Sequence, residues 1–323
     1  MNMEDKKIIA VVGSTGAQGG GLVKAILDDP NSPYRVRAIT RDANSEKAQA
    51  LIAKGAEVVA ATMDDLTSLE SAFAGAYGVF GVTNFWEHFK PELEITQAEN
   101  LAKAAKAAGV QHFVWSTLED TRKFLPLESN QMPTLMEKYK VPHFDAKGES
   151  DQFFKELGVP TTFLLTSFYW DNFIHFGMGP QPGPDGNLMI AFPMDDKPLP
   201  GIAAKDIGAC AYGVFKEGTD HVGRTVGIAG DHLTGAQMAS AMSESLGTPI
   251  GFYPISPEAF RALGFPGADD LGNMFQFKRD FNDSFVGARS VDVSRRLNPG
   301  LLSFRQWLEA YGSQIPLPEA ANA

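Results

Sequence analysis

Residues 7–27 read KIIAVVGSTGAQGGGLVKAIL, and this stretch decides the fold. The apolar run Lys7–Val12 predicts a buried strand, and Gly20–Leu27 predicts the helix that follows it. Between them, Gly13–Gly19 has the pattern GxxGxxG. Glycine lets a phosphate approach the backbone, and a helix N-terminus presents free N–H groups and the positive end of a dipole. This order of strand, loop and helix predicts a dinucleotide-binding unit, with a plain glycine turn as the simpler alternative.

The rest of the first half repeats this alternation of short apolar runs and helical patterns. Further strands are predicted over Arg35–Thr40, Glu57–Ala60, Gly78–Gly81, His112–Ser116 and Thr161–Leu165. Helices are expected near Ser45–Ala53 (capped by Ser45), Leu66–Phe73, Pro91–Ala108 and Phe144–Leu157. Strands joined by helices are typical of parallel sheets, because parallel neighbours need a long crossover connection. We therefore predict an α/β protein whose NADP-binding domain, residues 1–165, is a Rossmann-type doubly wound parallel sheet.

The alternation stops after residue 165. Residues 177–201 are rich in glycine and proline, which predicts loops or irregular structure. Thr225–Ile228 predicts one further strand, which we expect to join the first sheet. Lys205–Gly208 is expected to begin a helix that holds two domains together, with Cys210 buried inside it. Residues 166–323 are therefore predicted to form a smaller, interleaved C-terminal α/β domain that serves a substrate or a partner.

Composition excludes several classes of protein. The formal net charge of −11, from 39 acidic and 28 basic residues, disfavours direct contact with nucleic acid. Cys210 is the only cysteine, and the six histidines lack metal-ligand spacing, so neither a disulfide nor a metal site is predicted. No apolar run is long enough to span a membrane, and the acidic start Met1–Asp5 is unlike a secretion signal. We expect a cytoplasmic protein, with the nucleus as an alternative.

The end of the second predicted strand indicates which dinucleotide binds. An acidic residue at this point holds the ribose 2′-hydroxyl of NAD, whereas an arginine accommodates the 2′-phosphate of NADP. Here the strand is followed by Arg41 and then Asp42. Arg41 therefore favours NADP(H). We interpret Arg37 as structural and Asp42 as a turn residue.

Longer stretches resemble one protein family. The sequence is similar to the NmrA-like family of atypical short-chain dehydrogenases, and most of all to its NADPH-sensing members. The stretches that carry the resemblance are Gly13–Gly19, Val82–Glu87, His143–Glu149, Leu263–Leu271, Asn273–Phe275, Arg296–Pro299 and Gln306–Leu308. Because they are spread over nearly the whole chain, they are more specific than a glycine pattern alone.

The resemblance implies where the cofactor binds. It places the pyrophosphate at Gly13, Thr15, Gly16, Ala17, Gln18 and Gly19, the adenosine phosphate at Arg41, the adenine at Thr62 and Met63, the middle of the cofactor at Thr83, Asn84 and Phe85, the nicotinamide ribose at Lys147, and the nicotinamide at Tyr169, Trp170, Asp171 and Asn172. One position departs from the family pattern, since Thr62 stands where an acidic residue is usual. How adenine is held stays open, and Asp64 and Asp65 are equally suited to cap the next helix.

The residues expected to do chemistry are incomplete. Typical short-chain dehydrogenases carry Tyr-x-x-x-Lys on one helix face, where the lysine lowers the pKa of the tyrosine and the tyrosine moves the proton. Here Lys147 is present, but His143 occupies the tyrosine position and Tyr139 lies a further turn upstream. Histidine also transfers protons. Ser116 or Thr117 would be the hydroxyl partner, unless these hydroxyls merely end a strand.

Two functions follow from these residues. The first is an NADP(H)-binding redox sensor that acts in transcriptional regulation through a protein partner. The alternative is an NADPH-dependent reductase of a small apolar substrate, with His143, Lys147, Ser116 and Thr117 as its catalytic residues. The partners in this reading are a nicotinamide dinucleotide, a regulatory protein or small-molecule substrate, and a second copy in a homodimer. We interpret Phe168–Phe176 as core or as the wall of a cleft, and Phe275–Asp280 as a solvated charge run or a partner surface.

Overall fold

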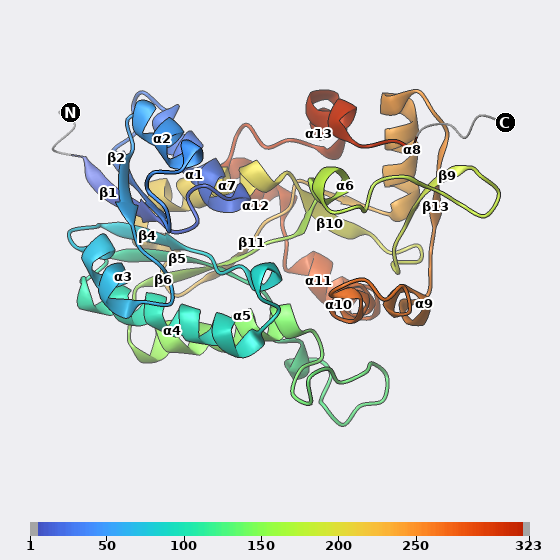
Figure 1. Cartoon of the computed structure of the whole chain (residues 1–323), viewed down its shortest axis with the longest axis horizontal. Helices are drawn as coiled ribbons and strands as arrows, with labels where there is room; N and C mark the ends of the chain where they lie inside the picture. The colour runs from blue at the N-terminus through green and yellow to red at the C-terminus, as the bar shows by residue number, and fades with distance from the viewer. Residues whose placement is uncertain (1–5, 319–323) are drawn as a thin grey trace.

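A seven-stranded parallel sheet organises the molecule (Figure 1). The computed structural model describes residues 6–318, so the acidic start Met1–Asp5 lies outside the described residues. The strands are β1 (Lys7–Val11), β2 (Tyr34–Thr40), β3 (Glu57–Ala60), β4 (Gly78–Gly81), β5 (His112–Thr117), β6 (Thr161–Leu165) and β11 (Thr225–Gly227). Every predicted strand is confirmed to within one residue, including the late strand β11, which pairs with β6.

The order of the strands creates the place where such sheets bind ligands. They lie side by side as β11-β6-β5-β4-β1-β2-β3. The chain adds β2 and β3 on one side of β1 and then crosses over to add β4, β5 and β6 on the other side, so the order of the strands reverses between β1 and β4. β1 pairs with β2 through Ile9 and Val36 and with β4 through Ile9 and Gly78. In open parallel sheets, ligands bind beyond the carboxyl ends of the strands at this reversal. We call the end at which β1, β4, β5 and β6 terminate the carboxyl edge.

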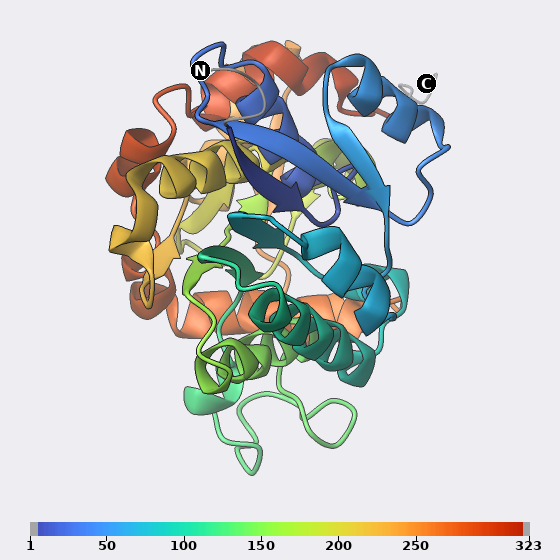
Figure 2. The same ribbon diagram turned by 90° about the vertical axis from the view of Figure 1, so that its left-hand side faces the viewer.

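Helices cover both faces of the sheet, because the residues of β1 alternate between two cores. Ile9 and Val11 pack against one set of helices, whereas Ile8 and Ala10 pack against the other. Figures 1 and 2 show the two layers, with α1 and α7 on one side and α3, α4 and α5 on the other. The helices of these layers are α1 (Ala17–Leu27), α2 (Glu46–Ala53), α3 (Leu66–Phe73), α4 (Pro91–Ala107), α5 (Pro142–Glu156), α7 (Ala204–Glu217) and α12 (Val291–Leu297).

Two helix starts differ from the prediction. α1 begins at Ala17, within the glycine pattern. The N–H of Gly16 closes a turn onto the carbonyl oxygen of Gly13, and the N–H of Gly20 makes the first helical bond, to the carbonyl oxygen of Gly16. α5 begins at Pro142, since proline suits the first turn of a helix. Ser45 caps α2 as expected, through a bond from the N–H of Ala48.

Glycines let α1 and α7 pack closely. A Cβ on Gly208 would lie 2.0 Å from the backbone nitrogen of Leu22, and a Cβ on Gly21 would lie 2.3 Å from the carbonyl oxygen of Lys205. Both distances are far below van der Waals contact, so only glycine fits at these positions. Helix α7 follows residue 166 in the chain yet packs on the first sheet, and Cys210 is fully buried in it.

The remaining chain forms the second region, which lies beside the first sheet in Figure 1. It contains two three-stranded sheets, in the orders β12-β10-β7 and β13-β9-β8. Its elements are β7 (Phe168–Tyr169), β8 (Gln181–Pro182), β9 (Leu188–Ala191), β10 (Leu199–Ile202), β12 (Asp231–Leu233), β13 (Ile250–Tyr253), α6 (Asn172–His175), α8 (Gly235–Leu246), α9 (Pro257–Arg261), α10 (Ala268–Asp280), α11 (Asn282–Gly287) and α13 (Phe304–Tyr311).

The expectation of loops or irregular structure over residues 177–201 holds for most of the segment but missed its strands. The segment contains β8, β9 and most of β10, and Gly186, in the turn between β8 and β9, adopts positive φ. Its strands have two to four residues, and β9 and β10 each pair with neighbours that are distant in sequence. Glycine and proline hid these short strands because they occur both in the turns between the strands and within β8 and β10 themselves.

The interpretation of Phe275–Asp280 as a solvated charge run was also wrong. Phe275, Phe277 and Lys278 are buried in α10, whereas Asp280 is exposed. The aromatic core of the second region includes Phe168, Trp170 and Phe173, which supports the core interpretation of that cluster, while Phe176 is 71% exposed. No helix among residues 6–318 combines the length and apolar character needed to cross a membrane.

Candidate functional site

The glycine loop leaves an open backbone cradle at the start of α1. Gly13 follows β1 with a φ of 65°, a conformation that favours glycine. Gly16 occupies the N-cap of α1, where no side chain caps the helix and no acidic residue lies in the first turn. A Cβ on Gly19 would lie 2.4 Å from the carbonyl oxygen of Gly13. The N-terminus of α1 is therefore free to receive an anion, and its shape fits the pyrophosphate of a dinucleotide.

Arg41 stands at the carboxyl edge, directly after β2, as the sequence predicted. Its guanidinium pairs with Glu87 in the one-turn helix η2 (Phe85–Glu87) that follows β4, and its side chain is 71% exposed. Sequence reasoning missed Glu87 as a partner. Arg37 is structural, since it binds Glu57 at 2.9 Å and the carbonyl oxygen of Ala74 at 2.7 Å.

The residues after β3 have local roles. The N–H of Thr62 donates to the Ser68 hydroxyl at 3.2 Å, and the carbonyl oxygen of Met63 accepts from Asn100 at 2.9 Å. Asp65 caps α3 by accepting from the N–H of Thr67, and Asp64 accepts from the Gln97 amide. The capping role predicted as an alternative for Asp64 and Asp65 is therefore confirmed for Asp65.

Lys147 lies in a buried network that sequence reasoning missed in part. Its Nζ donates to the carbonyl oxygen of Thr83 at 3.1 Å and to the Thr83 hydroxyl at 2.6 Å, and it lies 3.0 Å from Oε1 of Glu94. Three oxygens thus surround its three N–H groups. The Thr83 hydroxyl also donates to Oε1 of Glu94 at 2.6 Å. Glu94 on α4 is fully buried, and its Oε2 has no hydrogen-bond partner among the described residues.

His143 lies one turn before Lys147 on the same helix and is also buried. Its Nδ1 lies 2.5 Å from Oδ1 of Asp270, which comes from α10 of the second region. The rings of Trp86, Phe85 and Phe144 pack around the imidazole, at centroid distances of 4.8, 5.8 and 4.8 Å. Sequence reasoning singled out His143 but gave Asp270 no role, because 127 residues separate the two.

The two candidate hydroxyls at the end of β5 have different partners. Ser116 donates to the Gln18 side chain at 2.8 Å, and the same amide donates to the Tyr169 hydroxyl. Burial raises the pKa of Tyr169 to about 12. Thr117 donates to Asp151 at 2.7 Å, and burial raises the pKa of this carboxyl to about 6 despite that bond. The glycine loop, β5 and β7 therefore meet at Gln18.

The tetrapeptide Tyr169–Asn172 divides between the site and the core. Tyr169 faces Gln18, whereas Trp170 is buried against Phe304 and Trp307 in the core of the second region. Asp171 accepts from the N–H of Ala204 at 2.8 Å, and Asn172 begins α6. The structure thus gives Trp170 a packing role, while Asn84 remains exposed beside the buried Phe85.

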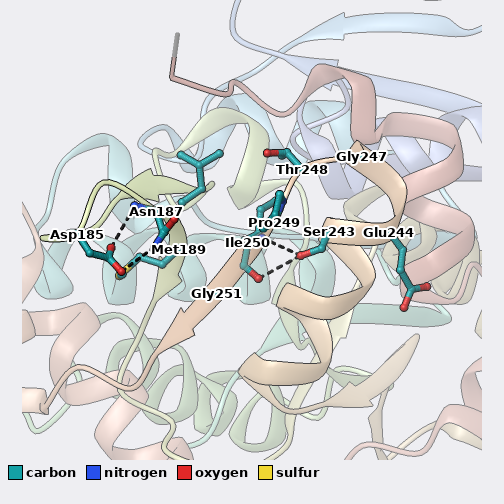
Figure 3. A pocket seen from close by; sticks show the side chains of 11 residues that line it. Asp185, Asn187, Met189, Ser243, Glu244, Gly247, Thr248, Pro249, Ile250 and Gly251 are labelled. Carbon is teal, nitrogen blue, oxygen red and sulfur yellow. Dashed lines mark hydrogen bonds between the residues drawn. The ribbon is translucent and has the colours of Figure 1, made fainter. Parts of the chain in front are cut away.

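A separate hollow lies away from these residues. Figure 3 shows it between α8, β9 and β13, where Ser243 accepts from the N–H of Ile250 at 2.8 Å and donates to the carbonyl oxygen of the same residue at 3.1 Å. None of the predicted site residues lines it. Within residues 6–318, no group of three or more histidine, cysteine, aspartate or glutamate side chains is placed to hold a metal ion.

Comparisons with known proteins find relatives over nearly the whole chain. The sequence profile described as the NmrA-like family matches residues 5–308. The chain is 27% identical to the NmrA-like family domain-containing oxidoreductase ptmS of Penicillium ochrochloron, covering 94% of this chain and 97% of that protein. It is 28% identical to the NmrA-like family domain-containing oxidoreductase FrzB of a Cladobotryum species, covering 84% of this chain and 83% of the relative.

Two solved structures share the fold. Crystalline NmrA, described as a negative transcriptional regulator and solved with NADP, superimposes with a TM-score of 0.77 at 23% identity over 96% of this chain and 97% of that one. A Citrobacter triphenylmethane reductase complexed with NADP(H) superimposes with a TM-score of 0.72 at 21% identity over 94% of this chain and 99% of that one.

Proposed function

The chain belongs to the NmrA-like family, and we propose that it is an NADP(H)-dependent oxidoreductase of a small apolar substrate. When bound, NADPH supplies a hydride, which no side chain can supply. The relatives ptmS and FrzB are named oxidoreductases, and the triphenylmethane reductase was solved with NADP(H), which supports this proposal. The residues of this chain bind and orient the cofactor and handle the proton.

One observation carries the proposal. His143 and Lys147 lie on one face of α5, and both are buried beside the loop that follows β4 at the carboxyl edge. An open backbone cradle lies at the same edge, at the start of α1. A group that handles protons, a cation and an anion cradle at one edge are the parts that a nicotinamide-dependent reductase needs.

The proposed cofactor contacts follow the geometry of the free protein. The backbone of Gly13–Gly19 would hold the pyrophosphate, and Arg41 would exchange Glu87 for the 2′-phosphate. The residues proposed for the rest of the cofactor are Thr62, Met63, Thr83, Asn84, Phe85, Lys147, Tyr169, Asp171 and Asn172. Because three oxygens already surround Nζ of Lys147, a ribose hydroxyl must replace one of them. We propose Ser116 as the hydroxyl nearest the chemistry, since it bonds to Gln18 of α1, which also reaches Tyr169, whereas Thr117 is bound to the Asp151 carboxylate.

A specific contact favours a second candidate, the redox sensor. Glu87 pairs with Arg41, and its neighbour Trp86 packs on Gly267 at the start of α10 in the second region. Binding of a 2′-phosphate at Arg41 would therefore act on a contact between the two regions. In that role the protein would regulate transcription through a protein partner in the cytoplasm or nucleus. The fold it shares with NmrA, a negative transcriptional regulator, is compatible with this candidate.

Two measurements test the proposed function. Titration of NADPH, NADP⁺, NADH and NAD⁺, followed by tryptophan fluorescence, should show that the two phosphorylated cofactors bind more tightly. NADPH consumption should then be followed with a panel of carbonyls, imines and activated alkenes. Equal binding of all four cofactors would contradict the role of Arg41. Tight binding of NADPH with no turnover would reject the oxidoreductase and leave the sensor.

A further inference from the structure

We propose that His143 and Asp270 form the proton-delivering pair of the site. In this pair, Nε2 of His143 gives a proton to the oxygen of a carbonyl substrate, and Asp270 is the positioning residue that holds the imidazole. The inference rests on the proposed oxidoreductase function and names the proton donor that the missing tyrosine leaves unassigned. It also gives a role to the stretch Leu263–Leu271, which the family resemblance singled out without one.

Asp270 holds His143 at two points. Its Oδ1 lies 2.5 Å from Nδ1 of the ring, and its Oδ2 accepts from the backbone N–H of the same histidine at 3.2 Å. The two side chains are only 7% and 6% exposed. A carboxylate bound at two points to one residue fixes both the position of the ring and the direction in which it points. This arrangement needs both regions of the molecule, since α5 carries His143 and α10 carries Asp270.

The contact decides which ring nitrogen is available. A carboxylate accepts, so the neutral ring carries its hydrogen on Nδ1, and protonation adds a second hydrogen on Nε2. This second hydrogen is the one that the ring can give away. Among residues 6–318, no hydrogen-bond partner of Nε2 is present, and this atom is not among the fully enclosed unpaired ones. Nε2 therefore keeps some exposed surface, and we propose that the substrate oxygen reaches it there. An imidazolium formed on protonation keeps the Asp270 carboxylate beside it, which stabilises the charge.

The surroundings of the ring define the substrate class. Phe85, Trp86 and Phe144 enclose His143, and they offer apolar and aromatic contact with no charge of their own. Lys147, one turn further along α5, is held by Thr83 and Glu94 and does not bond to the ring. The substrate that fits is an apolar aldehyde or ketone, whose oxygen would meet Nε2.

The reaction balances with the cofactor of the proposed function. The carbonyl carbon accepts a hydride from the reduced nicotinamide, so a C–H bond forms and the π pair of the carbonyl moves to the oxygen. The oxygen takes the proton from Nε2 of the doubly protonated His143 ring, so an O–H bond forms, the Nε2–H bond breaks, and the ring becomes neutral with its hydrogen on Nδ1. The substrate becomes an alcohol, the cofactor becomes NADP⁺, and the neutral imidazole regains a proton from water.

Asp270→Asn tests the positioning role, with Asp269→Asn as the matched control because Asp269 is the exposed neighbour on the same helix. An amide has one acceptor oxygen for the two donors of His143. The hydrogen of the ring is therefore no longer held on Nδ1 in every molecule. In the cofactor-free protein, nitrogen NMR of the imidazole should show the hydrogen on Nδ1 in the wild type and in Asp269→Asn, and a changed pattern in Asp270→Asn. This readout does not depend on turnover.

The kinetic arm uses para-nitrobenzaldehyde and acetophenone with NADPH. We expect Asp270→Asn to lower kcat about 10- to 100-fold and to leave the Kd of NADPH unchanged. The control Asp269→Asn should leave kcat, the Kd of NADPH and the melting temperature unchanged. His143→Gln should lower kcat at least as much. An unchanged NMR pattern in Asp270→Asn would overturn the positioning role, and an altered pattern with unchanged kcat would overturn proton delivery by His143. A wild type that binds NADPH but reduces neither these probes nor any carbonyl, imine or activated alkene of the wider panel would contradict the proposed function. A wild type that reduces only imines or alkenes would overturn the carbonyl substrate of this inference.

Discussion

Glu87 occupies Arg41 where a 2′-phosphate is proposed to bind, so this carboxylate competes with the cofactor. Glu87→Gln should tighten NADPH binding about 2- to 5-fold, because exposed ion pairs contribute at most about 1 kcal/mol. NADH lacks the phosphate, so its Kd should stay the same. Titration by tryptophan fluorescence measures both values. The exposed Glu92→Gln on α4 is the control, and an equal gain for both cofactors would refute the competition.

Lys278 is an amine buried among four phenylalanine rings, with its Nζ 5.3 to 5.9 Å from their centroids. Its pKa is lowered from 10.5 to about 7, mainly by burial and in part by the nearby Arg289, while Glu119 opposes the shift. Between these two values the unfolded chain binds more protons, so stability rises with pH by up to about 1.4 kcal/mol per pH unit. Below pH 7 both states are charged, and the full cost of burying the charge is present.

Lys278→Met removes this cost. The variant should therefore be more stable than the wild type at pH 6, and the difference should shrink as the pH rises toward 10. Urea unfolding across that range measures it, with the exposed Lys54→Met as the control. A difference that stays constant with pH would show that Lys278 does not titrate between the two states.

The sequence predicted residues whose role depends on local spacing, and missed those whose partners are distant. Gly13, Arg41 and Lys147 follow strands or lie on a helix face, so their positions could be predicted. Glu94 and Asp270 could not, because α4 and α10 reach Lys147 and His143 only through the packing of helices far apart in the chain. A single sequence carries no signal for such pairs.

At the scale of elements, α4 and α5 are joined by the buried pair of Glu94 and Lys147. Removing one partner leaves an unpaired buried charge, so Lys147→Met should lower the free energy of unfolding by about 3–5 kcal/mol. The double variant Lys147→Met, Glu94→Gln should recover much of this loss. A double-mutant cycle in urea measures the coupling, and strictly additive effects would argue against the pair. The double variant is also the better variant for testing the role of Lys147 in activity. It removes the lysine without leaving the Glu94 carboxylate buried and unpaired.

The contact between α1 and α7 depends on Gly208. A methyl group there meets the backbone of α1, so Gly208→Ala should lower the free energy of unfolding by about 1–3 kcal/mol. Gly287 in α11 is the control, since nothing lies within 4 Å of a Cβ at this position. Gly287→Ala should be neutral or stabilise by up to about 1 kcal/mol, because alanine favours helix. Equal urea midpoints for the two variants would contradict the packing argument.

Prediction of elements succeeded where burial is continuous. Most strands of the first sheet are buried runs bounded by loops, and the limits of all its strands were correct to one residue. The strands β8, β9 and β10 were missed because they lie in a segment rich in glycine and proline, residues that usually mark loops. In α10, the charged residues Lys278 and Arg279 led to the prediction of a solvated surface. The aromatic residues beside them pack in the core.

At the scale of the whole molecule, the candidate site lies where two regions meet. The first sheet and the helices packed on it supply the glycine loop, Arg41 and Lys147. The second region supplies Asp270 through α10. Trp86 packs on Gly267 at the start of the same helix. The sequence predicted the sheet and the cofactor, but it did not specify how the second region docks, and the proton-handling residues depend on that docking.

The measurement that tests the central claim most directly is NADPH oxidation by the wild-type protein with para-nitrobenzaldehyde, with the alcohol product quantified. We predict one alcohol formed per NADPH consumed, and a kcat/KM with NADH at least about 10-fold lower than with NADPH, because we propose that Arg41 binds the 2′-phosphate. Binding of NADPH without any alcohol formation, across this probe and the wider panel of carbonyls, imines and activated alkenes, would contradict the oxidoreductase.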